Sequence, residues 1–287
     1  MPEVTVRELW TYPVKGCQGV AADAIQITKM GIPGDRDFVL WKDGKLIDQK
    51  DTPRVAAVAA EYDPDQGTLR FHHAEQGTYE HRIRRDGAVR SAAWVLDEFD
   101  TVDQGDAVAE WLSAVMATDV RLVSAGAPWK INFPIPQMER VHDTAKQRFF
   151  AASPVSLANQ ASLDDLNKRL EVPVPMDRFR MNVVVDGLGP YEEDTLDSLG
   201  NDDVELLQVT PAERCVIITT DQKTGQRPKN DLMQVLAQYR RKKKEERFGS
   251  GLIFGNYMTV GREGTLRVGD RLVVGECPRP SRPDQGR

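Results

Sequence analysis

The chain has 287 residues, of which 40% are hydrophobic and 29% are charged, and its formal net charge is −6. This composition is that of an ordinary globular protein, and the negative charge does not indicate a nucleic-acid partner. No apolar run approaches the roughly 20 residues of a membrane span, and the N-terminus lacks the basic and apolar regions of a secretory signal, so we expect no membrane partner.

Short strands separated by turns are predicted over the first 100 residues. Asp43-Gly44 suits a tight hairpin turn, and residues 63–67 supply another turn. Strands this closely spaced, without helices between them, favour a small antiparallel barrel or sandwich. The runs with strand patterns are 5–10, 24–28, 38–41, 55–62 and 68–71.

A helix is expected to end this first module. Asp103 is placed to cap it, and Val108, Trp111, Leu112 and Val115 recur at the spacing of one helical face. The chain beyond this helix mixes helices with strands.

The second half contains two further helix signals. Ser153-Pro154 has the pattern of an N-cap followed by a proline at the first helical position. Residues 162–166 open another helix, with Leu163 and Leu166 inward. Gly269-Asp270 is predicted to join a final pair of strands, and the other predicted strands are 181–185, 204–209 and 216–220.

Cys215 is the residue with the most distinctive surroundings. It directly follows Arg214 and precedes a β-branched run, which predicts a thiol at the start of a strand beside a permanent positive charge. A neighbouring cation lowers the pKa of a thiol, and the thiolate is both the nucleophile and the metal ligand. The same local sequence also fits a buried cysteine that packs as a small apolar side chain.

The other two cysteines, Cys17 and Cys277, lie far from Cys215 in the sequence. Three sparse cysteines form neither a disulfide framework nor the four thiolates of an iron–sulfur cluster. We therefore expect a reducing, cytoplasmic setting, in which any redox chemistry uses another centre or an external electron donor.

Basic side chains stand at the ends of several predicted elements. Lys15 follows the first strand, Arg36 lies in a turn, Arg180 precedes a strand and Arg214 adjoins the thiol. Guanidinium forks and free backbone N–H groups bind anions, so these residues predict a phosphate or other anion site if they converge, and are solvated turn residues if they do not.

A basic run covers residues 240–247, after an apolar helical pattern that includes Leu232 and Leu236. Positive charge near a helix C-terminus complements the helix dipole. We interpret the run as a solvated helix end, with a docking patch for an acidic partner as the alternative.

In order along the chain, these motifs resemble those of the MOSC family (molybdenum cofactor sulfurase C-terminal domain), in the branch with an N-terminal β-barrel. The resemblance covers about residues 1–275 and is closest to the amidoxime-reducing components and their bacterial relatives, which reduce N-hydroxylated compounds. The segments that carry it are 12–19, 34–36, 162–167, 176–185, 214–221 and 254–256.

The resemblance implies a mixed, β-rich (α+β) fold. An N-terminal β-barrel-like domain would cover residues 1–120, a MOSC β-barrel domain with peripheral helices residues 121–275, and a disordered tail residues 276–287.

The resemblance also implies a molybdenum–molybdopterin cofactor. Cys215 would be the metal ligand and the catalytic residue, since a soft thiolate suits the metal. The residues expected to bind the cofactor are Lys15, Gly16, Arg36, Ala152, Ser153, Arg180, Asn182, Glu213, Arg214 and Cys215.

Three of these positions depart from the close relatives. Gly16 stands where they usually have serine, Ala152 where they often have threonine, and Glu213 where a small residue usually precedes Arg-Cys. A carboxylate at Glu213 is unfavourable beside an anionic ligand unless it points away or pairs with Arg214.

The leading hypothesis is a molybdenum-dependent reductase of small N-hydroxylated substrates, with electrons from a separate donor protein of the flavin, ferredoxin or cytochrome type. The alternatives are a sulfur carrier with a persulfide on Cys215 and a non-catalytic carrier of the cofactor. A thiol hydrolase that pairs Cys215 with a histidine ranks last, because none of the four histidines lies in a partner motif.

Overall fold

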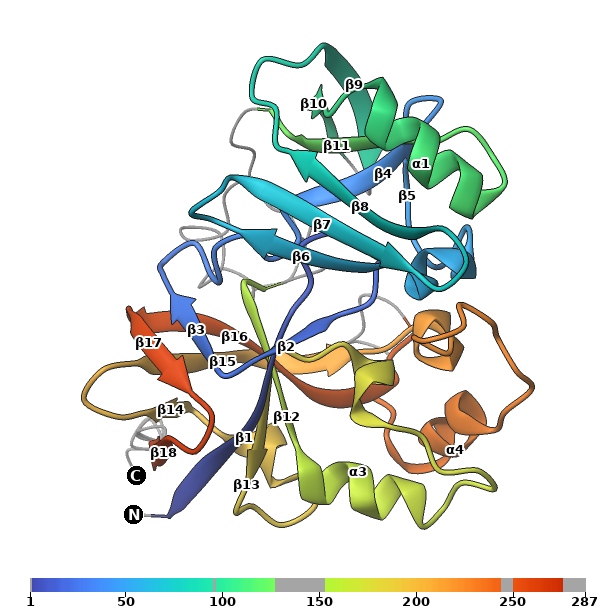
Figure 1. Ribbon diagram of the computed structural model, residues 1–287. Coiled ribbons are helices and arrows are strands. Elements are labelled where there is room, and N and C mark those ends of the chain that lie inside the picture. Colours follow the sequence, from blue (N-terminus) through green and yellow to red (C-terminus); the bar gives the residue numbers. More distant parts are fainter. Residues whose placement is uncertain (1, 95–96, 127–152, 244–249, 276–287) are drawn as a thin grey trace, which may run out of the picture.

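The computed structural model describes residues 2–94, 97–126, 153–243 and 250–275. Figure 1 shows two β-rich bodies stacked on one another, with α1 on the outside of the upper body and α3 and α4 on the outside of the lower one. The β-rich α+β class is confirmed.

The strands are β1 (Glu3–Thr11), β2 (Val20–Ala22), β3 (Ala24–Ile27), β4 (Phe38–Lys42), β5 (Lys45–Ile47), β6 (Ala59–Asp63), β7 (Thr68–His73), β8 (Gly77–Arg82), β9 (Val89–Trp94), β10 (Asp97–Asp103), β11 (Arg121–Ala125), β12 (Val155–Asn159), β13 (Val183–Asp186), β14 (Ser198–Gly200), β15 (Glu205–Glu213), β16 (Ile253–Arg262), β17 (Gly264–Arg267) and β18 (Arg271–Gly275). The helices are α1 (Asp106–Met116), α3 (Gln160–Asn167) and α4 (Leu232–Tyr239), with 3-10 turns η1 (Pro53–Ala57), η3 (Met176–Phe179), η4 (Glu192–Thr195) and η5 (Val216–Thr219).

The upper body is a closed barrel in the order β10-β11-β4-β5-β9, beside a sheet of β6, β7 and β8. The predicted hairpin is confirmed, with Asp43 and Gly44 at positive φ between β4 and β5. Helix α1 buries Val108, Leu112 and Val115 in the core of this body, as its spacing predicts.

The expected Asp103 cap is wrong. Gly105 is the N-cap residue of α1, and no side chain makes a capping hydrogen bond there. The Asp103 carboxylate instead forms ion pairs with Arg90 and Arg121, because it is nearly buried and two cations reach it. These charge-assisted bonds hold its pKa down at about 2 despite burial.

The lower body is a sheet in the order β13-β12-β16-β15-β14-β18-β1-β2, and a further pairing of β1 with β13 closes it. Its core includes Val6, Leu9, Leu157 and Val185. Strands β1 and β3 therefore hydrogen-bond with strands from beyond residue 120. The division of the chain at residue 120 stays a prediction, although β1 and β2 are strands of the lower sheet.

Two predicted elements in the second half are wrong. Residues 155–159 form the buried strand β12 rather than a helix, because all five are enclosed between β13 and β16. Residues 216–219 form the 3-10 turn η5 rather than a strand, since only Ile218 of the four is buried.

The final strands exist but do not pair with one another. β17 pairs with β3, whereas β18 lies between β1 and β14. The turn between them is held on β1, since Val6 exchanges backbone hydrogen bonds with Gly269 and Asp270.

The helices of the lower body pack on a third apolar cluster, in which Phe179 stacks on Phe254 with ring centroids 3.8 Å apart. Leu163 and Leu166 of α3 point into it, as predicted. Among the described residues, none of the helices combines the length and apolarity needed to cross a membrane.

Candidate functional site

One cavity gathers nine of the ten residues expected at the site, from both bodies. The tenth, Ala152, lies outside the described residues. The nine are Lys15, Gly16, Arg36, Ser153, Arg180, Asn182, Glu213, Arg214 and Cys215.

Cys215 lies where β15 ends and η5 begins. Its thiol is half-buried at the cavity, and its carbonyl accepts a hydrogen bond from Ile218 N at 3.2 Å. Arg178 fixes the far end of η5, because its guanidinium donates to Thr219 O at 3.0 Å and to the Asp221 carboxylate at 2.9 Å. The thiol therefore lies at the start of a turn that hydrogen bonds hold in place.

Cys17 is a different kind of thiol. It is fully buried in the apolar core of the upper body, and burial raises its pKa to about 12. It therefore stays protonated and behaves as a small apolar side chain.

The Arg214 guanidinium is held by three hydrogen bonds. Its Nε donates to Phe254 O at 2.9 Å, its Nη1 to Phe179 O at 3.0 Å and its Nη2 to the Met181 sulfur at 3.3 Å. Burial lowers the pKa of this guanidinium, since its charge is poorly solvated.

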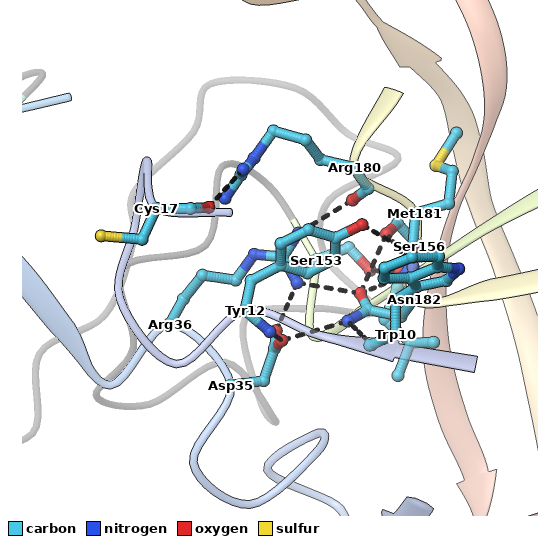
Figure 2. A network of polar contacts seen from close by, with 11 residues as sticks. Trp10, Tyr12, Cys17, Asp35, Arg36, Ser153, Ser156, Arg180, Met181 and Asn182 are labelled. Atoms are coloured by element: carbon cyan, nitrogen blue, oxygen red, sulfur yellow. Dashed lines mark hydrogen bonds and ion pairs between the residues drawn. The ribbon is translucent and has the colours of Figure 1, made fainter. Parts of the chain in front are cut away.

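Arg36 and Arg180 share an unusual backbone conformation, with φ of 53° and 56°. A non-glycine residue rarely adopts the left-handed region, and such residues cluster at functional sites. Both side chains lie beside the ring of Tyr12 (Figure 2).

The two guanidinium groups are fixed by polar contacts. Arg36 Nη1 donates to the Asp35 carboxylate at 2.5 Å and to Asn182 Oδ1 at 3.1 Å, and its Nη2 donates to Arg180 O at 3.0 Å. Arg180 Nη1 donates to Cys17 O at 2.5 Å and to Gln222 Oε1 at 3.0 Å. A guanidinium has five N–H donors, and the bonds to the described residues do not use all of them in either group.

Lys15 adds a fourth positive charge. Burial lowers its pKa to about 8, and repulsion from Arg36 and Arg180 acts in the same direction. Burial likewise lowers the pKa of Arg180 to about 10. Several cations are thus held with poor solvation, and an anion in the cavity would stabilise them.

Gly16 occupies a conformation that serine does not replace easily. Its φ is +89°, and a Cβ there would lie 2.8 Å from Val55 Cγ1. The conformation of this loop therefore explains why glycine stands here in place of serine. Gln49 holds the loop, since its amide donates to Gly16 O at 2.6 Å and pairs with the Gln222 amide at 2.9 Å.

Asn182 and Ser153 are already engaged. The Asn182 amide donates to Trp10 O and Asp35 Oδ1, and its oxygen accepts from Arg36 and Ser156. The Ser153 hydroxyl contacts backbone carbonyls, among them Val155 O at 3.1 Å. Asn182 thus orients Arg36, and a direct bond from either residue to a ligand stays a prediction.

Glu213 turns toward Lys242 and not toward Arg214. Its side chain is 3% exposed, and its carboxylate lies 3.9 Å from Lys242 Nζ and accepts from Gly251 N at 2.9 Å. The Lys242 ammonium also donates to Thr210 Oγ1 at 2.9 Å. The negative charge beside the cavity is therefore paired.

This contact changes the interpretation of the basic run. Helix α4 ends at Tyr239, and Arg240 is buried in an ion pair with Asp194 at 2.7 Å. The description of the run as a solvated helix end is therefore wrong for Arg240 and Lys242. Arg241 and Lys243 are exposed, and residues 244–247 lie outside the described residues.

Sequence reasoning missed several residues of the site. Tyr12 and Asp35 lie inside the motifs around Lys15 and Arg36, and Tyr257 directly follows a motif that ends at Asn256. The motifs therefore indicated their positions, but no function was predicted for them. Gln49 had no signal, because its contact with Gln222 joins residues 173 positions apart.

Two family models match separate parts of the chain. The model of the MOSC N-terminal beta barrel domain matches residues 3–119, and that of the MOSC domain matches residues 140–273. The mitochondrial amidoxime reducing component 2 of Bos taurus is 31% identical over 277 residues, which cover 93% of this chain and 82% of the relative. The mitochondrial amidoxime-reducing component 1 of Homo sapiens is 30% identical over 278 residues, which cover 94% and 82%.

Proposed function

The chain belongs to the MOSC family, and from this premise we propose that it is, like the amidoxime-reducing components to which it is similar, a molybdenum-cofactor-dependent reductase of small N-hydroxylated compounds. The observation that carries the proposal is the convergence of the Cys215 thiol with Lys15, Arg36, Arg180 and Arg214 around one cavity. The proposed reaction converts an amidoxime, two electrons and two protons into an amidine and water.

The chemistry of the donor set fits a molybdenum–pterin group. A cysteine thiolate is a soft ligand that suits such a metal, and guanidinium forks suit a phosphate. The lowered pKa values of Lys15 and Arg180 show that burial leaves these cations poorly solvated. A bound anionic group would stabilise their charges. Glu213 does not oppose this fit, because Lys242 faces its carboxylate.

When bound, the cofactor supplies the two-electron chemistry at its metal. The residues of the chain bind and orient it. Cys215 would hold the metal from its braced turn, and the four basic side chains would hold the anionic part. Tyr257, which is 8% exposed, lines the cavity together with Cys215.

The electrons are proposed to come from a separate protein of the flavin, ferredoxin or cytochrome type. A cytoplasmic location also stays a prediction.

Turnover with an artificial donor tests the proposal. Protein from a host that makes the cofactor is given a reduced low-potential dye and an aromatic amidoxime, and the amidine is quantified. We expect amidine with the parent protein and almost none with Cys215→Ser. Cys17→Ala is the matched control. The thiol that it removes is buried away from the cavity, so this variant should keep parental turnover. No amidine from molybdenum-loaded parent protein would reject the proposal.

A further inference from the structure

Tyr12 is a buried aromatic ring at the centre of the cationic site. The Arg36 Cζ lies 4.3 Å and the Arg180 Cζ 4.5 Å from its ring centroid. Both guanidinium groups are within the range of a cation–π contact, and Figure 2 shows the ring among the residues that fix them. The ring is 1% exposed, so these contacts form with little water present.

Three contacts fix the ring in place. Tyr12 N donates to Asp35 Oδ1 at 2.7 Å, and its hydroxyl donates to Met181 O at 3.1 Å. Gly19 packs so closely that a Cβ there would lie 2.3 Å from Tyr12 Cε1. The hydroxyl bond and the close approach of residue 19, which a side chain there would prevent, therefore restrain the ring.

The two arginines come from distant parts of the chain and carry like charges. Arg36 lies in the turn after β3, and Arg180 ends η3. Burial is the largest cause of the lowered pKa of Arg180, and repulsion from Arg36 acts in the same direction. The polar contacts described above hold each group, and the Tyr12 ring is in contact with both of them.

We propose that Tyr12 is a positioning residue, whose π-face holds the Arg36 and Arg180 guanidinium groups as a preformed pair for an anion. The negative face of the ring attracts both cations, and its rigidity fixes their separation before the anion arrives. That the anion belongs to the cofactor rests on the proposed function, whereas the pairing of the ring with the arginines does not.

A double-mutant cycle tests the pairing without any ligand. The free energy of unfolding is measured by urea denaturation for the parent, Tyr12→Leu, Arg180→Met and the double variant. Arg180→Met should raise the unfolding equilibrium constant in both backgrounds. We expect the factor to be about tenfold smaller in the Tyr12→Leu background than in the parent. Strict additivity would overturn the inference.

Two ring variants separate the π-face from the hydroxyl and from packing. Tyr12→Phe should keep the coupling with Arg180, since the ring remains. Pentafluorophenylalanine at position 12 keeps the ring shape but removes its negative face, so the coupling should disappear; this variant also serves if Tyr12→Leu does not fold. Loss of coupling in Tyr12→Phe, or its retention in the fluorinated variant, would refute a role for the π-face.

The consequence for binding is measured with inorganic phosphate. In calorimetry on cofactor-free full-length protein, we expect Tyr12→Leu to bind phosphate about tenfold more weakly and Tyr12→Phe to bind as the parent does. Tyr79→Leu is the matched control, because that ring stacks on Trp111 in the upper body and should leave binding unchanged. Parental affinity in Tyr12→Leu would overturn the positioning role. Absence of molybdenum from the parent protein would count against the proposed function alone.

Discussion

The buried pair of Glu213 and Lys242 gives a sharp prediction about stability. The two side chains are 3% and 9% exposed, and their charged atoms lie 3.9 Å apart. At an effective dielectric constant of roughly 20, two unit charges at this distance attract by about 4 kcal/mol. Removing one partner of a buried pair typically costs about 3–5 kcal/mol, because the attraction between the charges is lost while the other charge stays buried. Lys242→Met should therefore lower the free energy of unfolding by about 4 kcal/mol.

The second half of this prediction is a rescue. Glu213→Gln in the Lys242→Met background removes the buried negative charge, so most of the lost stability should return. Urea denaturation followed by tryptophan fluorescence measures all four proteins of the cycle. Lys243→Met is the matched control: this neighbouring lysine is exposed, and its loss should change stability by less than about 0.5 kcal/mol.

Two results would refute the reasoning. One is a Lys242→Met protein as stable as the Lys243→Met control. The other is a double variant no more stable than Lys242→Met alone, which would show that packing and not charge is responsible.

The remaining predictions concern the site and its surroundings. Arg36→Ala and Arg180→Ala should each weaken retention of the cofactor roughly ten- to hundredfold, as expected from a lost charge-assisted bond of about 1.5–3 kcal/mol; unchanged molybdenum after dialysis would contradict this. Cys215→Ser should keep the parental melting temperature while losing bound molybdenum, and parental metal content would contradict the ligand assignment. Burial raises the pKa of Glu193 from 4.5 to about 7, so the folded state holds a proton that the unfolded state releases, and parent stability should fall by about 3 kcal/mol between pH 4.5 and 7. Glu193→Gln should lack this fall in urea titrations. Pure protein given NADH alone should not turn over, because no G-x-G-x-x-G motif follows a strand.

From the sequence, a small barrel or sandwich, the α1 and α3 faces and the Asp43-Gly44 hairpin could be predicted, because each depends on local periodicity or turn chemistry. It failed where tertiary packing overrides local preference. Residues 216–219 have the composition of a strand, yet only Ile218 meets the core. Ser153-Pro154 has a helix-start pattern, yet the chain beyond it is enclosed between two strands.

The site shows the same limit. The motifs around Lys15, Arg36, Arg180 and Cys215 could be recognised, but their convergence depends on the pairing of β1 with β13, which joins residues about 180 positions apart. The partner of Glu213 was missed for a related reason. Lys242 stands in a run of like charges that predicts a solvated segment, and nothing local shows that one of them turns inward.

The most direct test of the account is the molybdenum and pterin content of the purified protein. The protein is made in a host that synthesises the cofactor, dialysed, and analysed for the metal by mass spectrometry and for the pterin by fluorescence after oxidation. The account predicts molybdenum and pterin in equal amounts in the parent, and the loss of both in a variant that combines Arg36→Ala with Arg180→Ala. A parent protein that carries neither, or a double variant that retains both, would contradict the assignment of the cavity as a cofactor site.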